Sequence, residues 1–246
     1  MKLTILALAA VASAAIAAAP SASRHPAAET RAAVAAALAD PARADQAGDD
    51  ARRQAAAVLA FSGVGPGDAV VDFLPGQGYW TRIFSGVVGP QGHVYALWPS
   101  NAAKYAAKSL PALQARGLSN VTAEVQATPL PTVPQPVDLF WTVQNYHDIP
   151  ASVIGQFNAA VFRALKPGGT YVVIDHADAA GAVPTEPFKH RIDPAVVRSQ
   201  VTAAGFRFVG ASPVLANPAD DHSKTVFDPA IRGHTDQFVF KFRKPG

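Results

Sequence analysis

The stretch that decides the fold is Val70-Val71-Asp72-Phe73-Leu74-Pro75-Gly76-Gln77-Gly78-Tyr79. Its apolar start predicts a buried strand over 69–73, and a helix is expected to follow the glycines. Glycines in the intervening turn let the backbone approach a ligand closely, and the start of a helix offers N–H groups without partners. This order of elements predicts a small-molecule site at the carboxyl end of a strand. The glycines taken alone fit an ordinary strand-to-helix turn equally well.

Short apolar runs recur beyond this stretch, and segments with helical spacing separate most of them. Strands that alternate with helices predict an α/β fold with a doubly wound, mostly parallel sheet and right-handed crossovers. Towards the end, a helix over 194–204 leads to runs at 206–211 and 237–242, which we expect to form a hairpin-like pair. The other expected strands are 69–73, 92–97, 121–125, 137–141 and 170–175, and the helices between them are 81–87, 102–116 and 151–165.

The composition of the chain excludes several kinds of site and partner. The chain has 246 residues and is 49% apolar, which is enough for one domain with a sizeable core. It has no cysteine, so disulfides, thiolate metal sites and cysteine nucleophiles are excluded. The net charge of +3 comes without any block of like charges, so nucleic acid is not an expected partner. A small-molecule substrate is the expected partner, and the sequence does not determine the oligomeric state.

The first 23 residues have the features of a secretory signal peptide. Met1 and Lys2 precede an apolar run rich in alanine and leucine, and small residues follow it. A retained membrane anchor is the alternative, but the run is marginal for a span of about 20 residues. We therefore expect an exported, periplasmic or secreted protein with no stable membrane insertion after signal removal. We expect residues 24–51 to be a helical or flexible lead-in and residues 52–246 to be the α/β domain.

A second stretch, Lys166-Pro167-Gly168-Gly169, follows an expected helix and precedes the buried run 170–175. Together with the glycine loop after Asp72, it resembles the class I S-adenosylmethionine-dependent methyltransferases. The resemblance covers roughly 52–244 and implies a Rossmann-like sheet of seven strands with an antiparallel last strand. It also implies S-adenosylmethionine as cofactor, with the methionine part at the glycine loop and the adenosine near the second strand. The cofactor-binding residues that we predict on this basis are Asp72, Pro75, Gly76, Gly78, Tyr79, Trp98 and Asn145.

The chain is most similar to a small group of exported predicted methyltransferases. This resemblance rests on the Pro-Gly-x-Gly-Tyr loop at 75–79, on Asn145-Tyr146-His147-Asp148, and on the strings 217–221, 227–229 and 232–236. The function of that group is itself inferred mainly from its fold. The resemblance therefore predicts architecture more firmly than chemistry.

Three features depart from the methyltransferase pattern. Leu74 stands where the family usually has its first glycine, and Trp98-Pro99 stands where an acid usually binds the ribose. Trp98 is predicted either to stack on an adenine ring or simply to pack in the core. An exported protein would also be separated from a cytoplasmic methyl donor. These departures favour an alternative, a non-enzymatic exported ligand-binding protein that retains the fold.

The residues just after the fourth and fifth strands are candidates for chemistry, because ligands bind at the carboxyl edge of such sheets. His147 and His176 are the predicted catalytic residues, one of them as general base towards a methyl acceptor. A surface or capping role is the competing interpretation for each. Histidine and aspartate at these positions also suggest a metal, but their spacing matches no established ligand pattern, so we predict no metal site.

Overall fold

The computed structural model describes residues 24–183 and 188–246, and the predicted signal peptide at 1–23 lies outside them. One sheet of seven strands forms the centre of the molecule, with the order β3-β2-β1-β4-β5-β7-β6. All neighbouring pairs are parallel except those of β7, which runs antiparallel to both β5 and β6. The strands are β1 Ala69–Phe73, β2 His93–Trp98, β3 Val121–Val125, β4 Val137–Val143, β5 Leu165–His176, β6 Arg207–Ser212 and β7 Gln237–Arg243. The predicted fold class and the antiparallel last strand are confirmed.

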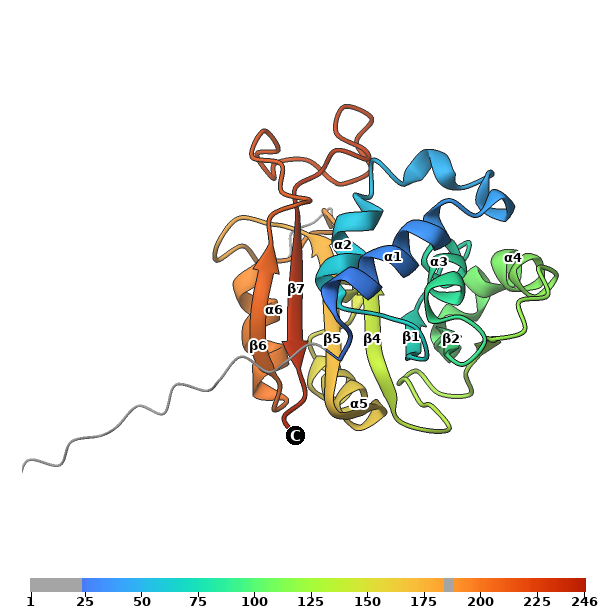
Figure 1. Ribbon diagram of the computed structural model, residues 1–246. Coiled ribbons are helices and arrows are strands. Elements are labelled where there is room, and N and C mark those ends of the chain that lie inside the picture. Colours follow the sequence, from blue (N-terminus) through green and yellow to red (C-terminus); the bar gives the residue numbers. More distant parts are fainter. Residues whose placement is uncertain (1–23, 184–187) are drawn as a thin grey trace, which may run out of the picture.

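Helices cover both faces of this sheet (Figure 1). One face packs against α1 Ala27–Leu38, α2 Ala55–Ser62, α3 Tyr79–Val88 and α4 Ala103–Gln114. The other face packs against α5 Ile154–Ala164 and α6 Pro194–Ala203. Because alternate residues of a strand point to opposite faces, both layers need apolar strands, and β1 is buried along its whole length.

The start of β5 differs from the expected turn. The sequence predicts a turn at 166–169 and a strand from residue 170, whereas β5 already begins at Leu165. Gly168 has a φ of +75°, and the register against β4 shifts between Val137 and Leu139. The tail extends the pairing, since Gly168 N–H donates to Lys244 O at 3.0 Å and Lys244 N–H donates to Gly169 O at 2.9 Å. The glycines therefore form an irregular first part of the strand.

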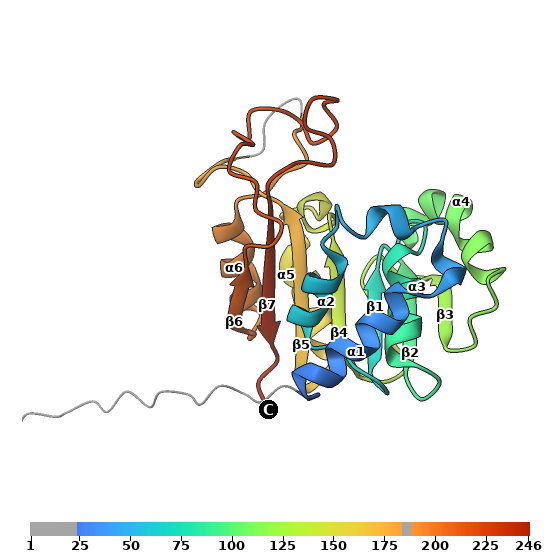
Figure 2. The same ribbon diagram turned by 45° about the horizontal axis from the view of Figure 1, so that its top comes forward.

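The lead-in, residues 24–51, lies across α3 and reaches the carboxyl edge of the sheet (Figure 2). After α1 it makes two short 3₁₀ turns, Pro41–Arg43 and Ala47–Asp49. Arg82 of α3 binds Asp45 of the lead-in at 2.8 Å. Val34 and Ala37 of α1 are buried in the same core cluster as α3. This segment therefore forms part of the wall at the edge where a ligand is expected.

A second long segment, residues 213–236, rises from the same edge between β6 and β7 (Figure 1). It contains turns and bends but no helix or strand. No helix within 24–183 and 188–246 is long and apolar enough to cross a membrane.

Candidate functional site

A cavity of about 500 Å³ opens at the carboxyl ends of β1 and β4. This is where the strand order reverses direction, and ligands bind at such points in open α/β sheets. Its volume lies within the usual range for small-molecule sites. Three segments line it: the lead-in with Asp45, Gln46, Gly48, Asp49 and Arg53, the glycine loop with Asp72, Phe73, Leu74, Pro75, Gly76, Gln77, Tyr79 and Trp80, and the end of β4 with Val143, Gln144 and Asn145.

Asp72 is a buried carboxyl at the cavity wall, with 2% of its surface exposed. Burial raises its pKa to about 7, although the hydrogen bonds from Thr81 and the charge of Arg53 oppose the shift. Thr81 Oγ1 donates to Asp72 Oδ2 at 2.6 Å and connects the carboxyl to the first turn of α3. A cationic ligand group in the cavity would stabilise the ionised form of Asp72.

Arg53 brings the opposite charge to the same cavity. Its guanidinium lies over the ring of Tyr79, 4.5 Å from the ring centroid. Within the described residues its Nε is buried without a hydrogen bond, and the Asp49 carboxylate is 3.6 Å away from it. The cavity therefore has one wall suited to an ammonium group and another suited to a carboxylate.

The glycine loop gives the two glycines different surroundings. Gly76 has a φ of +57°, and a side chain there would enter open space at the cavity wall. Gly78 has a φ of +76°, does not line the cavity, and would place a Cβ 2.8 Å from Leu113 Cδ1. Gly76 therefore faces the ligand space, whereas Gly78 accommodates the packing of α4.

Non-glycine residues with positive φ gather around this edge. Leu74 takes a φ of +55° at the place of the missing glycine, and Gln144, also in the cavity wall, has a φ of +58°. Such backbone conformations cost of order 1–3 kcal/mol each and are concentrated at functional sites. The leucine therefore keeps the backbone conformation that a glycine would adopt. The others in the described residues are Gln54, His190 and His222.

The lead-in is fastened over the glycine loop by polar contacts. Tyr79 OH donates to Asp50 Oδ1 at 2.7 Å, and Gln46 Nε2 donates to Gln77 O at 3.2 Å. The predicted residue Tyr79 thus joins two walls of the cavity. The sequence does not reveal this closure, because the charged run around Asp50 is typical of a solvated surface.

Asn145 also joins two walls, since its side-chain amide donates to Phe73 O at 3.1 Å. Trp98, by contrast, does not line the cavity. It is 1% exposed and lies in a small apolar cluster with Ala106 and Leu113 of α4. Of the two roles weighed for Trp98, this position corresponds to core packing.

His147 lies just beyond the cavity wall, two residues after Asn145. Its Nδ1 is 2.7 Å from Asp175 Oδ1, and its backbone N–H donates to Asp175 Oδ2 at 2.9 Å. Burial disfavours the charged imidazole, but the charges of Asp175 and Asp148 and the Asp175 hydrogen bond outweigh it and raise the pKa of His147. Asp175 therefore orients the ring and leaves Nε2 on the side away from this carboxylate.

The side chains of His190 and Asp148 lie close to His147 Nε2. His190 Nδ1 lies 3.3 Å from His147 Nε2 and 3.2 Å from Asp148 Oδ1. Asp148 Oδ1 is 3.5 Å from His147 Nε2. His190 has no sequence motif around it and stands 43 positions after His147, so only the fold reveals this group.

His176 has different surroundings, although its ring centroid is 6.0 Å from that of His147. Burial lowers its pKa to about 4, and its Nδ1 bonds to Thr235 Oγ1 at 2.8 Å. Neither histidine lines the cavity. A buried imidazole with so low a pKa is a weak base, so the structure favours His147 over His176 as a proton acceptor.

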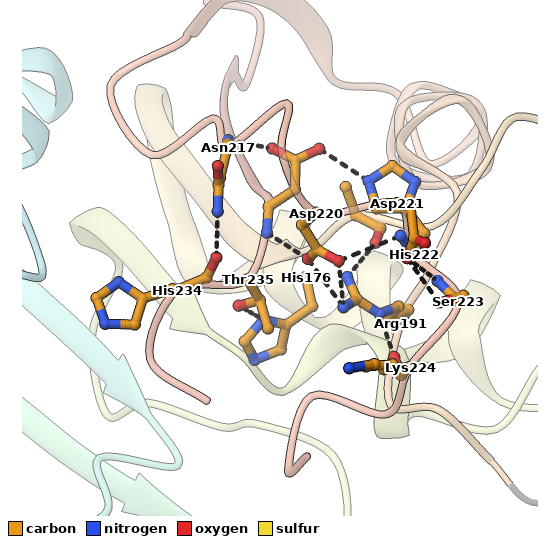
Figure 3. Close-up of polar contacts among 12 residues, drawn as sticks. His176, Arg191, Asn217, Asp220, Asp221, His222, Ser223, Lys224, His234 and Thr235 are labelled. Carbon is orange, nitrogen blue, oxygen red and sulfur yellow. Dashed lines mark hydrogen bonds and ion pairs between the residues drawn. The ribbon is translucent and has the colours of Figure 1, made fainter. Parts of the chain in front are cut away.

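Beside His176, the segment 213–236 is held by a dense polar network (Figure 3). The Arg191 side chain is fully buried and forms an ion pair with Asp220, in which Nη2 donates to both carboxylate oxygens at 2.9 and 3.0 Å. Arg191 also donates to Ala177 O and Lys224 O, each at 2.9 Å. Asp236 N–H donates to Asp220 at 2.7 Å. Strings far apart in the sequence thus form one structural unit over the sheet edge.

Comparisons with known proteins support the architecture. The structure of an S-adenosylmethionine-dependent methyltransferase from Aquifex aeolicus matches 87% of this chain and 97% of its own, with a TM-score of 0.56 and 18% identity. The glycopeptide N-methyltransferase MtfA, solved with S-adenosylmethionine, matches 77% of this chain and 86% of its own, with a TM-score of 0.55 and 15% identity. No protein-family model and no curated protein matches the sequence.

The same fold also occurs with other chemistry. The [4+2]-cyclase SpnF matches 79% of this chain and 80% of its own, with a TM-score of 0.58 and 18% identity. At such identities the likeness establishes the fold alone, and function has to be argued from the site.

Proposed function

We propose that the cavity at the glycine loop binds S-adenosylmethionine and that the chain transfers its methyl group to a small-molecule acceptor. The observation that carries this proposal is that Asp72 and Arg53 line the same cavity as Gly76, and that the space around a Cβ at Gly76 is open. The methionine part of the cofactor has an ammonium and a carboxylate on one carbon, which matches these opposite charges. The methyltransferase fold of the solved neighbours adds support.

The residues present fit the methionine part. The Asp72 carboxyl has Thr81 as its hydrogen-bond donor, and the charge of Arg53 also favours its ionised form. A bound ammonium would supply a second, directly bound positive partner. The buried Nε of Arg53, which has no hydrogen-bond acceptor in the described structure, would gain one in the ligand carboxylate. At Gly76 the absent side chain leaves room for the ligand against the backbone.

The cofactor supplies an electrophilic methyl group when it is bound. Transfer of such a group depends mainly on proximity and alignment, so the chain has to hold the acceptor at the carboxyl edge and exclude water. The lead-in lies over the glycine loop, where the hydrogen bonds of Tyr79 and Gln46 hold it, and it helps to exclude water. His147, oriented by Asp175, is the residue that we propose as proton acceptor for a hydroxyl or amine.

Calorimetric titration with S-adenosylhomocysteine tests the proposal, with the Gly76→Asn variant as the key measurement. Asparagine tolerates positive φ better than most residues, so the loop should survive while its side chain enters the cavity. Gly168→Asn is the matched control, because Gly168 also has a positive φ, +75°, and open space around its Cβ. We expect micromolar binding in the wild type and in Gly168→Asn, and its loss in Gly76→Asn.

Equal binding in both variants would contradict the assignment of the loop. Gly78→Val is a poorer test, because the clash with Leu113 would disturb the packing of α4 as well as the loop.

One observation favours a second candidate, a non-enzymatic protein that binds a smaller zwitterion. No residue of β2 or of the loop after it lines the cavity, and Trp98 packs in the core instead of facing it. The cavity therefore has no wall at β2, where the fold would hold adenosine. Titration with methionine and with adenosine distinguishes the candidates. If methionine binds and S-adenosylhomocysteine binds no more tightly than methionine does, the second candidate is supported over the first.

We also propose that residues 1–23 direct export, on the charge and hydropathy pattern alone. Expression of the full chain with a carboxy-terminal tag, followed by fractionation and amino-terminal sequencing, tests this. A processed chain outside the cytoplasm supports export, and a full-length cytoplasmic chain contradicts it.

A further inference from the structure

We propose that His147, Asp148 and His190 bind one divalent cation of the zinc class at the carboxyl edge of the sheet. The three side chains come from the turn after β4 and from the segment between β5 and α6. The proposal is independent of the cofactor cavity, because none of the three lines it.

The separations of the three ligand atoms fit a tetrahedral ion. Two ligands at about 2.1 Å from zinc in tetrahedral geometry lie about 3.4 Å apart. His147 Nε2, His190 Nδ1 and Asp148 Oδ1 are 3.2, 3.3 and 3.5 Å from one another. Ligands at right angles in an octahedral site at the same bond length would lie closer, about 3.0 Å apart. The distances therefore favour zinc-like coordination with a fourth position left open.

The orientation of His147 is that of a metal ligand with outer-shell support. The Nδ1–H of its neutral form would donate to Asp175, which is fully buried, and the lone pair on Nε2 then points at the other two side chains. Metal-binding histidines commonly have such a carboxylate on their second nitrogen. Asp175 is thus a positioning residue in this proposal. Its contact with His147 holds the ring in this orientation even without a cation.

His190 is held in place by packing. Its ring lies 4.6 Å from Phe188 and 4.8 Å from Phe227, centroid to centroid, and its φ of +58° is unfavourable for a residue with a side chain. A hydrogen on His190 Nδ1 can serve His147 or Asp148 fully, but not both at once. A cation satisfies all three atoms together.

The proposed metal site is accessible from solvent. The side chain of Asp148 is 53% exposed and that of His190 is 30% exposed, whereas His147 is 3% exposed. The site thus combines a buried ligand with two at the surface, so an ion can enter and keep an exchangeable position for water or a substrate oxygen. A bound cation occupies the lone pair of His147, so zinc would then inhibit any methyl transfer that uses His147 as a base.

Calorimetry with zinc alone tests the proposal on purified chain freed of metal by a chelator, at pH 8. We expect one site per chain with a dissociation constant of about 1 μM or tighter. His190→Ala and Asp148→Asn should each weaken it by at least about tenfold. His222→Ala is the matched control, because His222 also faces a carboxylate, Asp236 at 3.0 Å, with 22% exposure.

Cobalt provides a second readout, because tetrahedral Co²⁺ absorbs strongly in the visible range. The absorption should appear in the wild type and in His222→Ala and disappear in His190→Ala. Absence of saturable binding in folded protein overturns the proposal, and so does binding that His190→Ala and Asp148→Asn both retain. A thermal melt of each variant separates loss of the site from loss of folding, which matters most for the partly buried His190.

Discussion

Asp72 and Asp220 are both buried carboxyls at the same edge of the sheet, yet their surroundings are opposite. Asp220 accepts hydrogen bonds from Arg191 Nη2 at both carboxylate oxygens and from backbone N–H groups, and these outweigh its burial and lower its pKa. Asp72 has Thr81 as its neighbouring donor, and burial raises its pKa to about 7. The comparison shows that a buried carboxyl with internal partners secures a loop, whereas one facing a cavity with few partners is suited to an external cation.

Removal of Arg191, the internal partner of Asp220, should have the largest effect on stability. Arg191→Ala leaves Asp220 buried without its counter-charge, which typically costs about 3–5 kcal/mol. We expect urea unfolding to show a loss of stability of this size. Arg116→Ala is the control, because its pair with Asp45 is about half exposed and should contribute little to stability. Equal effects of the two changes would contradict the structural role of Arg191.

Removal of the charge at Asp72 should act in the opposite sense on stability. A carboxyl whose pKa is raised on folding stabilises fully below its unfolded value near 4, and that contribution is lost as the pH rises towards 7. Asp72→Asn should therefore raise the free energy of unfolding at pH 8, by on the order of 3 kcal/mol. The same variant should bind S-adenosylhomocysteine at least about tenfold more weakly. A variant that is destabilised at pH 8 would show that the carboxylate has a structural role.

The pH dependence of binding sharpens the same contrast. Only ionised Asp72 attracts an ammonium group, so affinity for S-adenosylhomocysteine should fall about tenfold per pH unit below 7. Asp45 and Asp49, the other acids of the cavity, have lowered pKa values and stay ionised over this range. Calorimetry from pH 5 to 8 should give this slope in the wild type and a flat profile in Asp72→Asn. A slope that persists in the variant would assign it to another group.

The smallest effect is expected at the lead-in. Gln46→Ala removes one exposed hydrogen bond to Gln77 O and leaves the contact of Tyr79 with Asp50 in place. We expect stability to change by less than about 1 kcal/mol and the ligand dissociation rate to rise about threefold. Stopped-flow measurement of dissociation checks this. An unchanged rate would mean that the lead-in does not restrain the ligand.

The order of the elements could be predicted because most strands contain a mainly apolar run and helical segments separate most of these runs. The strands at 69–73 and 121–125 have the predicted limits, and the terminal pair β6 and β7 is antiparallel as expected. The Rossmann-like order and the position of β7 came from the resemblance to a family. Local patterns specify elements, but they do not specify which strands are neighbours.

Much of the candidate site depends on contacts that no local pattern contains. The glycine loop identified the place of the cavity, and Asp72, Gly76, Tyr79 and Asn145 line it as a group. Arg53 was missed because charged residues in sequence usually mark a solvated surface. His190 was not among the predicted site residues, because its partners lie 42 and 43 positions earlier and only folding brings them together. The sequence left two roles open for Trp98, and its burial corresponds to the packing role.

The position of β7 has a consequence for synthesis. This strand, residues 237–243, lies between β5 and β6 instead of at an edge. Until it has left the ribosome, β5 and β6 each present a row of unpaired backbone groups, and such rows pair readily with other chains. The sheet therefore closes only after residues 237–243 have been made. A nascent chain halted before residue 237 should need a chaperone to remain free of aggregates.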